Sequence, residues 1–231
     1  MSLPVSAVVP TLNEAENIST CLEALRAAGV AEIVVVDGGS TDDTLERAVA
    51  LSDATLRQDG GLVAQLNRGA RECSHPYLLF QYADGVFPLE GASALIAALE
   101  RGATGGAFRL AFDSDRRAFR TIARGAAWRN RLGFGPFGDQ SIFASAAAFE
   151  EIGGFDAEAC LPDFDLVKRL KRAGRFELLE EAVVSSVRRW EKDGVLATTW
   201  THWRVSLEYL LGRGRCSRKT KGTTEELRRV R

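Results

Sequence analysis

Residues 33–42 carry the sequence IVVVDGGSTD, which decides the fold class predicted for this chain. The first four residues are β-branched and predict a strand that is buried on both faces, as in a parallel sheet. Residues 40–43 have the form of a capping box, so a helix is expected to begin at Thr44. A buried strand that leads through glycines into a helix indicates an α/β protein.

Asp37 stands at the end of this strand, beside Gly38 and Gly39. In open α/β sheets, ligands bind beyond the carboxyl ends of the strands, and glycines let a ligand approach the backbone closely. A carboxylate in that place can accept hydrogen bonds from ribose hydroxyls or from a base N–H. The alternative is a simple strand-to-helix turn in which the acid caps the next helix.

The chain has 231 residues, of which 45% are hydrophobic and 26% charged, and these values suit a single α/β domain. The net charge of −1 excludes a general electrostatic preference for nucleic acid. Four widely spaced cysteines without a Cys-x-x-Cys pair predict reduced thiols in a cytoplasmic protein. The sequence begins without a signal-peptide pattern, and no apolar run reaches the roughly 20 residues that span a bilayer.

Hydrophobic periodicity predicts an alternation of strands and helices along the chain. Strands are expected at residues 5–9, 33–36, 54–57, 77–82, 106–112, 141–144 and 181–187. Helices are expected from residue 18 to the glycine at 29, at 44–51, 63–70, 92–99, 116–131 and 146–152, from residue 162, and at 195–211. We expect Asn13 to cap the first helix, with Glu16 completing the reciprocal bond. The strand-helix-strand beginning predicts a mostly parallel central sheet flanked by helices.

Three acids, Asp37, Asp84 and Asp163, stand at strand ends or helix starts, which a parallel sheet gathers at one edge. Asp84 suits a divalent cation or a ribose, and the alternative is an ordinary turn acid. Asp163 suits a general base or a helix cap. Arg189, beside Trp190, suits a diphosphate, and the alternative is an exposed ion pair. The two histidines have no partner at metal-ligand spacing, and the P-loop, the dinucleotide fingerprint and the hydrolase elbow are absent.

Six short motifs in chain order resemble family 2 glycosyltransferases, which are inverting enzymes that use nucleotide-diphospho sugars. They are PTLNE at 10–14, VVDGGSTD at 35–42, AQLNRGA at 64–70, YAD at 82–84, GDQ at 138–140 with GGF at 153–155, and PD at 162–163 with RW at 189–190. The compact length resembles the small soluble branch linked to radical-enzyme and selenium-associated gene clusters. The resemblance implies one A-type glycosyltransferase domain over residues 1–231, with a nucleotide-sugar half at about 1–112, an acceptor half at about 113–212 and a basic tail at 213–231.

The resemblance also implies roles for individual residues. On the donor side these are Pro10, Thr11, Glu14 and Asp37 for the nucleoside, Gly61 and Asn67 in the nucleotide-loop region, Asp84 for Mg²⁺ or Mn²⁺, and Arg189 for the diphosphate. Asp163 would be the catalytic base, and Asp139, Gln140 and Trp190 would contact the acceptor. The donor is expected to be a UDP-sugar rather than a GDP-sugar, and the acceptor a glycan, a lipid-linked sugar or a small molecule.

The chain departs from the family pattern around the phosphates, the metal and the acceptor. The departures are Tyr82 for the first acid of the metal triplet, Gly85 at the position after Asp84, Pro162 for the acid before the base, Ser186 for a glutamine and Leu62 for an arginine. They leave open a non-catalytic nucleotide-sugar or glycan-binding protein. A nucleotidyltransferase is a third hypothesis, although its glycine-rich opening with Arg and Lys is absent. The last helix and the basic tail suggest contact with the inner face of a membrane, and the alternative is packing on the domain or in a homodimer.

Overall fold

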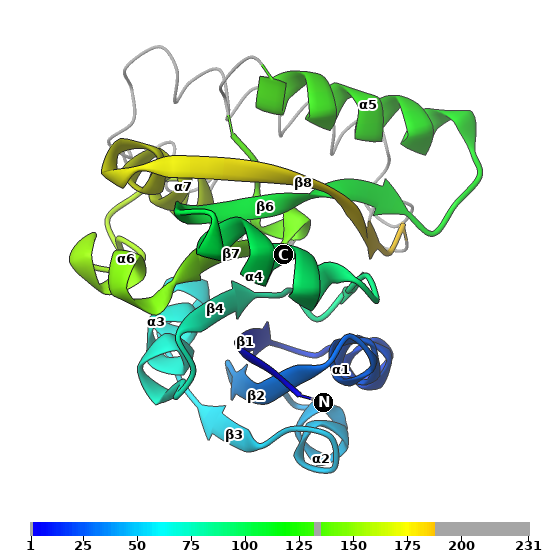
Figure 1. Cartoon of the computed structure of the whole chain (residues 1–231). Helices are drawn as coiled ribbons and strands as arrows, with labels where there is room; N and C mark the ends of the chain where they lie inside the picture. The colour runs from blue at the N-terminus through cyan, green and yellow to red at the C-terminus, as the bar shows by residue number, and fades with distance from the viewer. Residues whose placement is uncertain (1, 132–134, 188–231) are drawn as a thin grey trace.

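One mixed sheet organises the structure, a computed structural model that describes residues 2–131 and 135–187. Within these residues, eight strands lie in the order β3-β2-β1-β4-β7-β6-β8-β5 (Figure 1). They are β1 (Leu3–Thr11), β2 (Val30–Asp37), β3 (Ala54–Arg57), β4 (Tyr77–Phe80), β5 (Gly85–Val86), β6 (Ala103–Phe112), β7 (Ile142–Ser145) and β8 (Arg175–Ser185).

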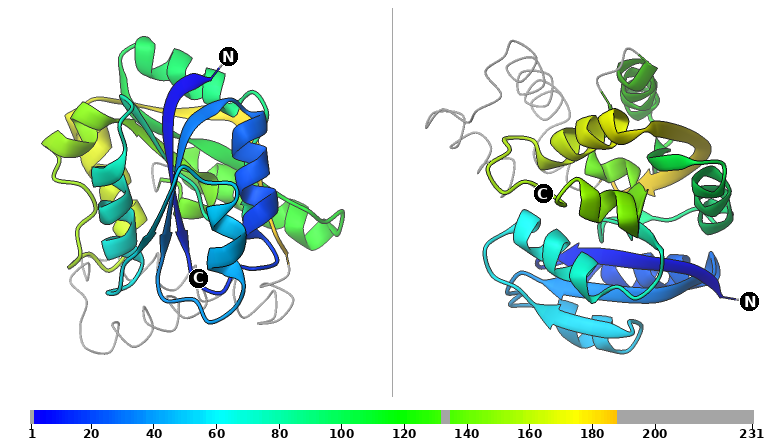
Figure 2. Two further views of the ribbon diagram at one scale, coloured as in Figure 1. Left: turned by 90° about the horizontal axis from the view of Figure 1, so that it is seen from below. Right: turned by 60° about the vertical axis from the view of Figure 1, so that its left-hand side comes forward.

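The helices lie on both faces of this sheet (Figure 2). They are α1 (Ile18–Ala27), α2 (Thr44–Val49), α3 (Leu62–Glu72), α4 (Gly91–Glu100), α5 (Arg117–Arg131), α6 (Ala146–Glu151) and α7 (Pro162–Ala173), with a 3-10 turn η1 (Gly138–Gln140). The predicted α/β class, with a mostly parallel sheet flanked by helices, is confirmed.

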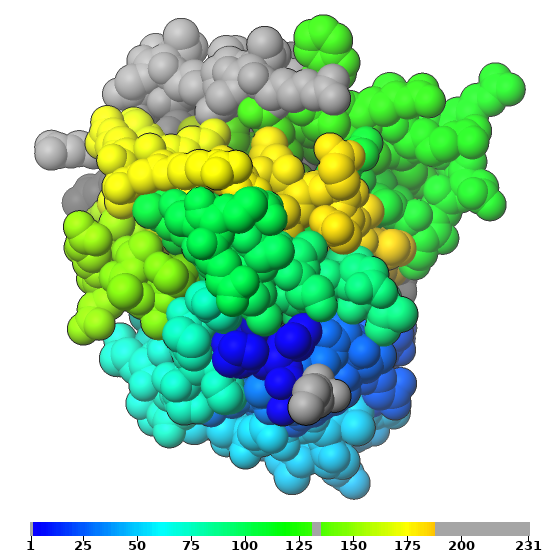
Figure 3. Space-filling view, in the orientation of Figure 1, coloured from blue at the N-terminus to red at the C-terminus, as the bar shows by residue number. Residues whose placement is uncertain are grey.

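The first four strands form the parallel part of the sheet. β1 pairs in parallel with β2 and with β4, and β2 pairs in parallel with β3. The chain therefore passes from β1 to β2 and β3 on one side and then returns to β4 on the other side. β7 is antiparallel to β4 and β6, whereas β8 is parallel to β6. In the space-filling view, the blue-to-cyan first part lies below the green-to-yellow second part (Figure 3).

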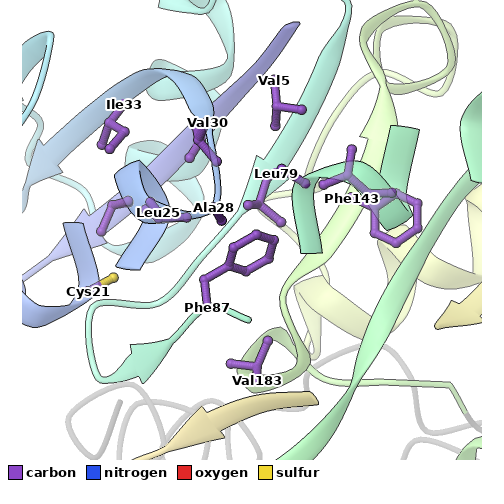
Figure 4. Close-up of a cluster of buried hydrophobic side chains, with 14 of the residues drawn as sticks. Val5, Cys21, Leu25, Ala28, Val30, Ile33, Leu79, Phe87, Phe143 and Val183 are labelled. Carbon is purple, nitrogen blue, oxygen red and sulfur yellow. The ribbon is translucent and has the colours of Figure 1, made fainter. Parts of the chain in front are cut away.

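Both faces of β2 are buried, which explains its four consecutive β-branched residues. Ile33 and Val35 pack in one hydrophobic cluster with α1 and α4, part of which is shown in Figure 4. Val34 and Val36 pack in a second cluster with α3, α6 and α7 on the opposite face. Because successive side chains of a strand alternate between faces, only a strand covered on both sides needs an unbroken apolar run.

Several predicted strand boundaries are wrong, among them the beginning of β2, which lies at Val30 rather than residue 33. β4 ends at Phe80 rather than at residue 82, because the Gln81 amide donates to the carbonyls of Tyr82 and Gly85 and turns the chain. β6 and β8 begin at residues 103 and 175 rather than 106 and 181. The two strands pair in parallel across two register irregularities, and this pairing lengthens both of them. Local periodicity does not show such a long-range effect.

The predicted cap of the first helix is also wrong. Asn13 has a positive φ of 56° and its Oδ1 accepts the Thr41 N–H at 2.9 Å, whereas α1 begins five residues later, at Ile18. The loop after β1 instead binds the loop after β2. The Asn13 N–H donates to Ser40 Oγ and the Glu14 N–H donates to Thr44 Oγ1. The predicted beginning of α2 at Thr44 is confirmed.

Cys21 and Cys73 are free, as predicted, but the prediction of a reduced thiol is wrong for Cys160, which is disulfide-bonded. Spacing along the chain does not show which cysteines the fold brings together. Among the described residues, no helix is long and apolar enough to cross a membrane. The predicted helix at 195–211 and the basic tail at 213–231 lie outside the described residues.

Candidate active site

A cleft opens at the carboxyl ends of β1 and β2, where the sheet order changes direction between β1 and β4. Ligands of open α/β sheets bind at such switch points. The described residues that line the cleft are Pro10, Thr11, Leu12, Glu14, Gly38, Gly61, Leu62, Gln65, Tyr82, Ala83 and Asp84. Five predicted donor-site residues are therefore brought together here, namely Pro10, Thr11, Glu14, Gly61 and Asp84.

Asp37 does not line the cleft, and its carboxylate binds the turn that follows it. Oδ2 accepts the N–H groups of Gly39 and Ser40 at 2.9 and 3.0 Å, and Oδ1 accepts the Ser40 hydroxyl. The side chain is 1% exposed. Asp37 thus holds the loop beside Gly38, a cleft residue, which favours the turn interpretation that the sequence left open.

Gln65 is a cleft residue to which the sequence gave no role. Its Nε2 donates to the Thr11 carbonyl and the Val36 carbonyl, both at 2.9 Å, and the side chain is 5% exposed. The amide therefore ties the ends of β1 and β2 together on the cleft floor. The sequence shows only a Gln in the first turn of a predicted helix, because its burial and its partners, 29 and 54 residues away, depend on the fold.

The N-terminus of α3 faces the same cleft. Gly60 and Gly61 have φ values of 101° and 82°, a region that favours glycine, and they lead directly into the helix at Leu62. The first N–H groups of a helix have no partner within it, and the helix dipole favours an anion there. Because Gly61 and Leu62 line the cleft, this helix end can receive a negatively charged ligand.

Asn67 lies away from the cleft, although the family motif contains it. Its Nδ2 donates to the Phe155 carbonyl at 2.8 Å, and its Oδ1 accepts the Phe155 N–H at 2.9 Å. It therefore ties α3 to the turn after α6, across 88 residues of sequence. The GGF segment at 153–155 is held by this same pair of bonds.

Asp84 is the carboxylate of the altered metal triplet and is half-buried in the cleft wall. Its carbonyl accepts the Ser186 N–H at 3.1 Å, so the end of β8 adjoins it. Among the described residues, no group of three or more His, Cys, Asp or Glu could hold a metal. Mg²⁺ in phosphate-binding sites is commonly held by one or two carboxylates together with substrate phosphates and water. Asp84 in a cleft with an anion-binding helix end fits an ion that is shared with a diphosphate.

A buried thiol lies behind the wall that contains Asp84. Cys21 Sγ lies 3.6 Å from the Tyr82 carbonyl oxygen. Burial raises the pKa of the Cys21 thiol, and the charges of Asp84 and Glu14 raise it further. The thiol is therefore protonated and unreactive.

Asp163, the predicted base, lies in the first turn of α7 and is 2% exposed. The Tyr82 hydroxyl donates to Oδ1 and Oδ2 of Asp163, both at 3.0 Å, and the Gly138 N–H donates to Oδ2 at 3.1 Å. Asp163 is not among the described residues that line the cleft, whereas Tyr82 is. The fold thus links the cleft to Asp163 through a phenol that replaces the first acid of the metal triplet.

Two of the predicted acceptor residues, Asp139 and Gln140, lie in the turn whose Gly138 N–H binds Asp163. Gln140 is 1% exposed; its Nε2 donates to the Phe108 carbonyl and its Oε1 accepts from Arg129 Nη2. Asp139 is half-buried in the turn η1, next to Gly138. Gln140 therefore supports this turn from within the protein. Arg189 and Trp190 lie outside the described residues.

This α/β architecture, with its cleft at the switch point, is that of the A-type glycosyltransferases. The chain belongs to the family described as "Glycosyl transferase family 2", whose model matches residues 6–149. The predicted family and the predicted glycosyltransferase class are therefore confirmed at family level. The further prediction of a radical-enzyme and selenium-associated branch stays a prediction.

Two relatives illustrate the similarity in sequence. "Glycosyltransferase AglJ" of Haloferax volcanii is 35% identical over 100 residues, which are 42% of this chain and 33% of that protein. The chain thus spans a third of the length of this relative. "PGL/p-HBAD biosynthesis glycosyltransferase" of Mycobacterium bovis is 28% identical over 246 residues, covering 83% of this chain and 93% of that protein.

Solved structures show the same fold. The mannosyltransferase PcManGT of Pyrobaculum calidifontis, in complex with GDP-Man and Mn²⁺, has a TM-score of 0.67 at 17% identity and covers 100% of this chain and 70% of its own. Glucosyl-3-phosphoglycerate synthase of Mycobacterium tuberculosis, with Mn²⁺, UDP and glucosyl-3-phosphoglycerate, has a TM-score of 0.63 at 21% identity over 92% of this chain and 80% of its own. TarS of S. aureus, with UDP-GlcNAc, has a TM-score of 0.65 at 18% identity over 81% of this chain and 59% of its own.

Proposed function

We propose that the protein transfers a sugar from a nucleotide-diphospho sugar to an acceptor hydroxyl, with inversion at the sugar carbon. The observation that carries this proposal is the cleft itself, which combines the carboxylate of Asp84 with the N-terminus of α3 at the switch point. A helix end and a shared cation are the two means by which such folds hold phosphates. Family membership supports the class of reaction.

The donor proposed is a UDP-sugar. Two of the similar structures carry UDP or UDP-GlcNAc and one carries GDP-Man, so uridine is favoured and guanosine is the alternative. Glu14, which lines the cleft and is 8% exposed, is proposed to bind the nucleoside together with the backbone of Pro10 and Thr11. Leu12, 50% exposed at the cleft, offers an apolar contact to the base.

Asp84 is the described residue proposed to hold Mg²⁺ or Mn²⁺ together with the donor diphosphate. The ion, when bound, neutralises charge on the leaving diphosphate. The N-terminus of α3 contributes in the same direction, because its N–H groups and dipole favour a growing negative charge. Arg189 is proposed to assist from outside the described residues.

Asp163 is proposed as the base that takes up the proton of the acceptor hydroxyl during a single displacement. The donors from Tyr82 and Gly138 hold the carboxylate in one orientation. Asp139, next to Gly138, and Trp190, which lies outside the described residues, are proposed to contact the acceptor. The nucleotide half is proposed at about 1–112 and the acceptor half at about 113–212.

The acceptor proposed is a glycan, a lipid-linked sugar or a small hydroxylated molecule. The similar synthase from M. tuberculosis was solved with glucosyl-3-phosphoglycerate, so small acceptors occur on this fold. A cytoplasmic location, with contact to the inner face of a membrane through the C-terminal region, and a homodimer stay proposals.

Calorimetric titration with a panel of UDP- and GDP-sugars, first with Mn²⁺ and then with a chelator, tests the donor proposal. Metal-dependent binding of one nucleotide sugar is expected. Binding of none of them would contradict the proposed function. Donor binding without hydrolysis or transfer to any acceptor would favour the alternative, a non-catalytic binding protein. The altered metal triplet is the observation that supports this alternative.

Asp163→Asn tests the assignment of the base. We expect donor affinity to change by less than about twofold and turnover to fall by 10²–10⁴-fold, the usual contribution of a general base. Turnover that survives the substitution would show that another residue is the base. Asp165→Asn, on the same helix turn and paired with Arg169, is a matched control that should keep turnover.

A further inference from the structure

The geometry points to Tyr82 as a catalytic residue that passes the acceptor's proton to Asp163. This inference rests on the proposed function and adds a step to it. The phenol takes the position of an acid in the family's metal triplet, so its chemistry differs from that of the residue it replaces. Three observations support the step. They are the different access of Tyr82 and Asp163 to the cleft, the hydrogen bonds between these two residues, and the close packing of Gly138 against the phenol.

Access separates the two residues. Tyr82 lines the cleft with Ala83 and Asp84, whereas Asp163 is 2% exposed and is not among the described residues that line the cleft. Because Tyr82 is a cleft residue and its hydroxyl reaches Asp163, an acceptor hydroxyl beside the donor is proposed to meet Tyr82 before it meets the carboxylate. A base this deeply buried needs either a large movement or an intervening group that can carry a proton.

Hydrogen bonds connect Tyr82 and Asp163 in the orientation that proton transfer from the phenol to the carboxylate requires. The phenol O–H donates to both oxygens of Asp163 at 3.0 Å, so its proton already points toward the carboxylate. A phenol oxygen can accept a hydrogen bond as well as donate one. The Gly138 N–H, at 3.1 Å from Oδ2, fixes the carboxylate on the other side.

The Tyr82 phenol packs so closely against Gly138 that only glycine fits at that position. A Cβ added at Gly138 would lie 2.2 Å from the Tyr82 Oη and 2.3 Å from Cζ, so residue 138 has to be glycine while the ring occupies this place. The Phe137 ring next to this glycine packs on the Phe164 ring next to Asp163, with centroids 6.2 Å apart. Gly138 and Asp163, which contact the phenol, are thus each flanked by a packed aromatic ring.

The step balances as follows. The acceptor oxygen forms its bond to the sugar carbon while the bond from that carbon to the diphosphate breaks, and the diphosphate leaves with the electron pair. The acceptor proton passes to the Tyr82 oxygen as the Tyr82 proton passes to Asp163. Tyr82 ends neutral and Asp163 ends protonated, so no further reactant is required.

Tyr82→Phe is the central test, because it removes one oxygen and keeps the ring. We expect kcat to fall by at least about a hundredfold, to the level of Asp163→Asn. The Tyr82→Phe/Asp163→Asn double variant should be no slower than either single variant, because both substitutions interrupt the same proton transfer. Donor affinity by calorimetry should stay unchanged, whereas the thermal midpoint should fall by a few degrees, because the buried Asp163 carboxylate loses a donor. Tyr77→Phe, a half-buried tyrosine on β4, is the matched control and should keep full turnover.

Two more variants distinguish the relay from a degenerate metal site. Gly138→Ala keeps the phenol but displaces it from Asp163, so kcat should fall as in Tyr82→Phe. Tyr82→Asp restores the family triplet but removes the phenol, so it should stay as slow as Tyr82→Phe. A Tyr82→Asp variant faster than wild type would overturn the relay and show an altered metal site instead.

The outcomes separate this inference from the proposed function. If Asp163→Asn is inactive but Tyr82→Phe keeps more than about a tenth of wild-type kcat, the relay is overturned and Asp163 remains the base. Active Asp163→Asn would overturn both the base and the relay. Absence of transfer by the wild type with every donor would overturn the proposed function itself, and the relay with it.

Discussion

Asp37, the last residue of β2, and Asp84, four residues after the end of β4, share the same local chemistry, an acid followed by glycine, yet the fold uses them differently. Asp37 is 1% exposed and accepts hydrogen bonds from Gly39 and Ser40 in its own turn. Asp84 is half-buried in the cleft wall. The sequence predicted a ligand-binding role for both of them.

The two turns differ in which groups form their hydrogen bonds. After Asp37 the backbone N–H groups turn back toward the carboxylate, so the acid itself completes the turn. At Asp84 the Gln81 amide donates to the carbonyls of Tyr82 and Gly85, and the Ser186 N–H donates to the Asp84 carbonyl. The turn there is held by other groups, so the Asp84 carboxylate is not needed for it. A strand-end acid is therefore a better candidate ligand when another side chain holds its turn.

The largest effect is expected at Asp84. Asp84→Asn keeps the shape but removes the charge, so kcat/KM should fall by at least about a hundredfold, or about 2.7 kcal/mol. Unfolding by urea should be unchanged, because the carboxylate does not support the turn. Initial rates at varied Mn²⁺ measure the first effect. Equal metal dependence in the variant and the wild type would contradict the role of Asp84.

Asp37→Ala should show the opposite pattern. The variant leaves the N–H groups of Gly39 and Ser40 without their charged partner, so the free energy of unfolding should fall by about 2 kcal/mol. Donor affinity should change less than in Asp84→Asn. Urea unfolding and calorimetry on the same preparation measure both. Normal stability with lost donor binding would show that Asp37 binds the ligand directly.

Gln65→Leu sharpens the comparison on the cleft floor. The variant removes the donor to the Thr11 and Val36 carbonyls while keeping an apolar side chain of similar size. We expect a loss of about 1–2 kcal/mol in stability and a weaker donor complex, because the ends of β1 and β2 separate. Gln58→Ala is a control, since that amide donates to the adjacent Asp59 carbonyl. Similar losses in both variants would argue against a special role of Gln65.

The smallest effect is expected at Glu32, near the beginning of β2. Burial alone would raise the pKa of Glu32, but hydrogen bonds from Ser6 and Ser74 outweigh it and lower this pKa below 4.5. The stabilisation is therefore present above about pH 4.5 and is lost as the pH falls through the lower folded value. Glu32→Gln should cost about 1 kcal/mol or less at pH 7, a difference that shrinks in acid. A difference that grows toward pH 3 in urea titrations would contradict this assignment.

The sequence by itself determined the parallel first half, the family and the two acids on which the proposed chemistry rests. Periodicity and turn residues are local signals, and strand-helix-strand units in this half are built from contacts that those signals describe. The switch point then follows from the rules of α/β sheets, so the position of Asp84 at the sheet edge could be predicted.

Only the tertiary structure decided which side chains meet. Tyr82 and Asp163 are 81 residues apart, and Asn67 and Phe155 are 88 apart, so no local pattern connects them. The sequence treated Tyr82 as a lost metal ligand, whereas the fold pairs it with the proposed base. A hydrogen bond depends on distance and orientation in space, and these exist only once the sheet has brought distant segments together.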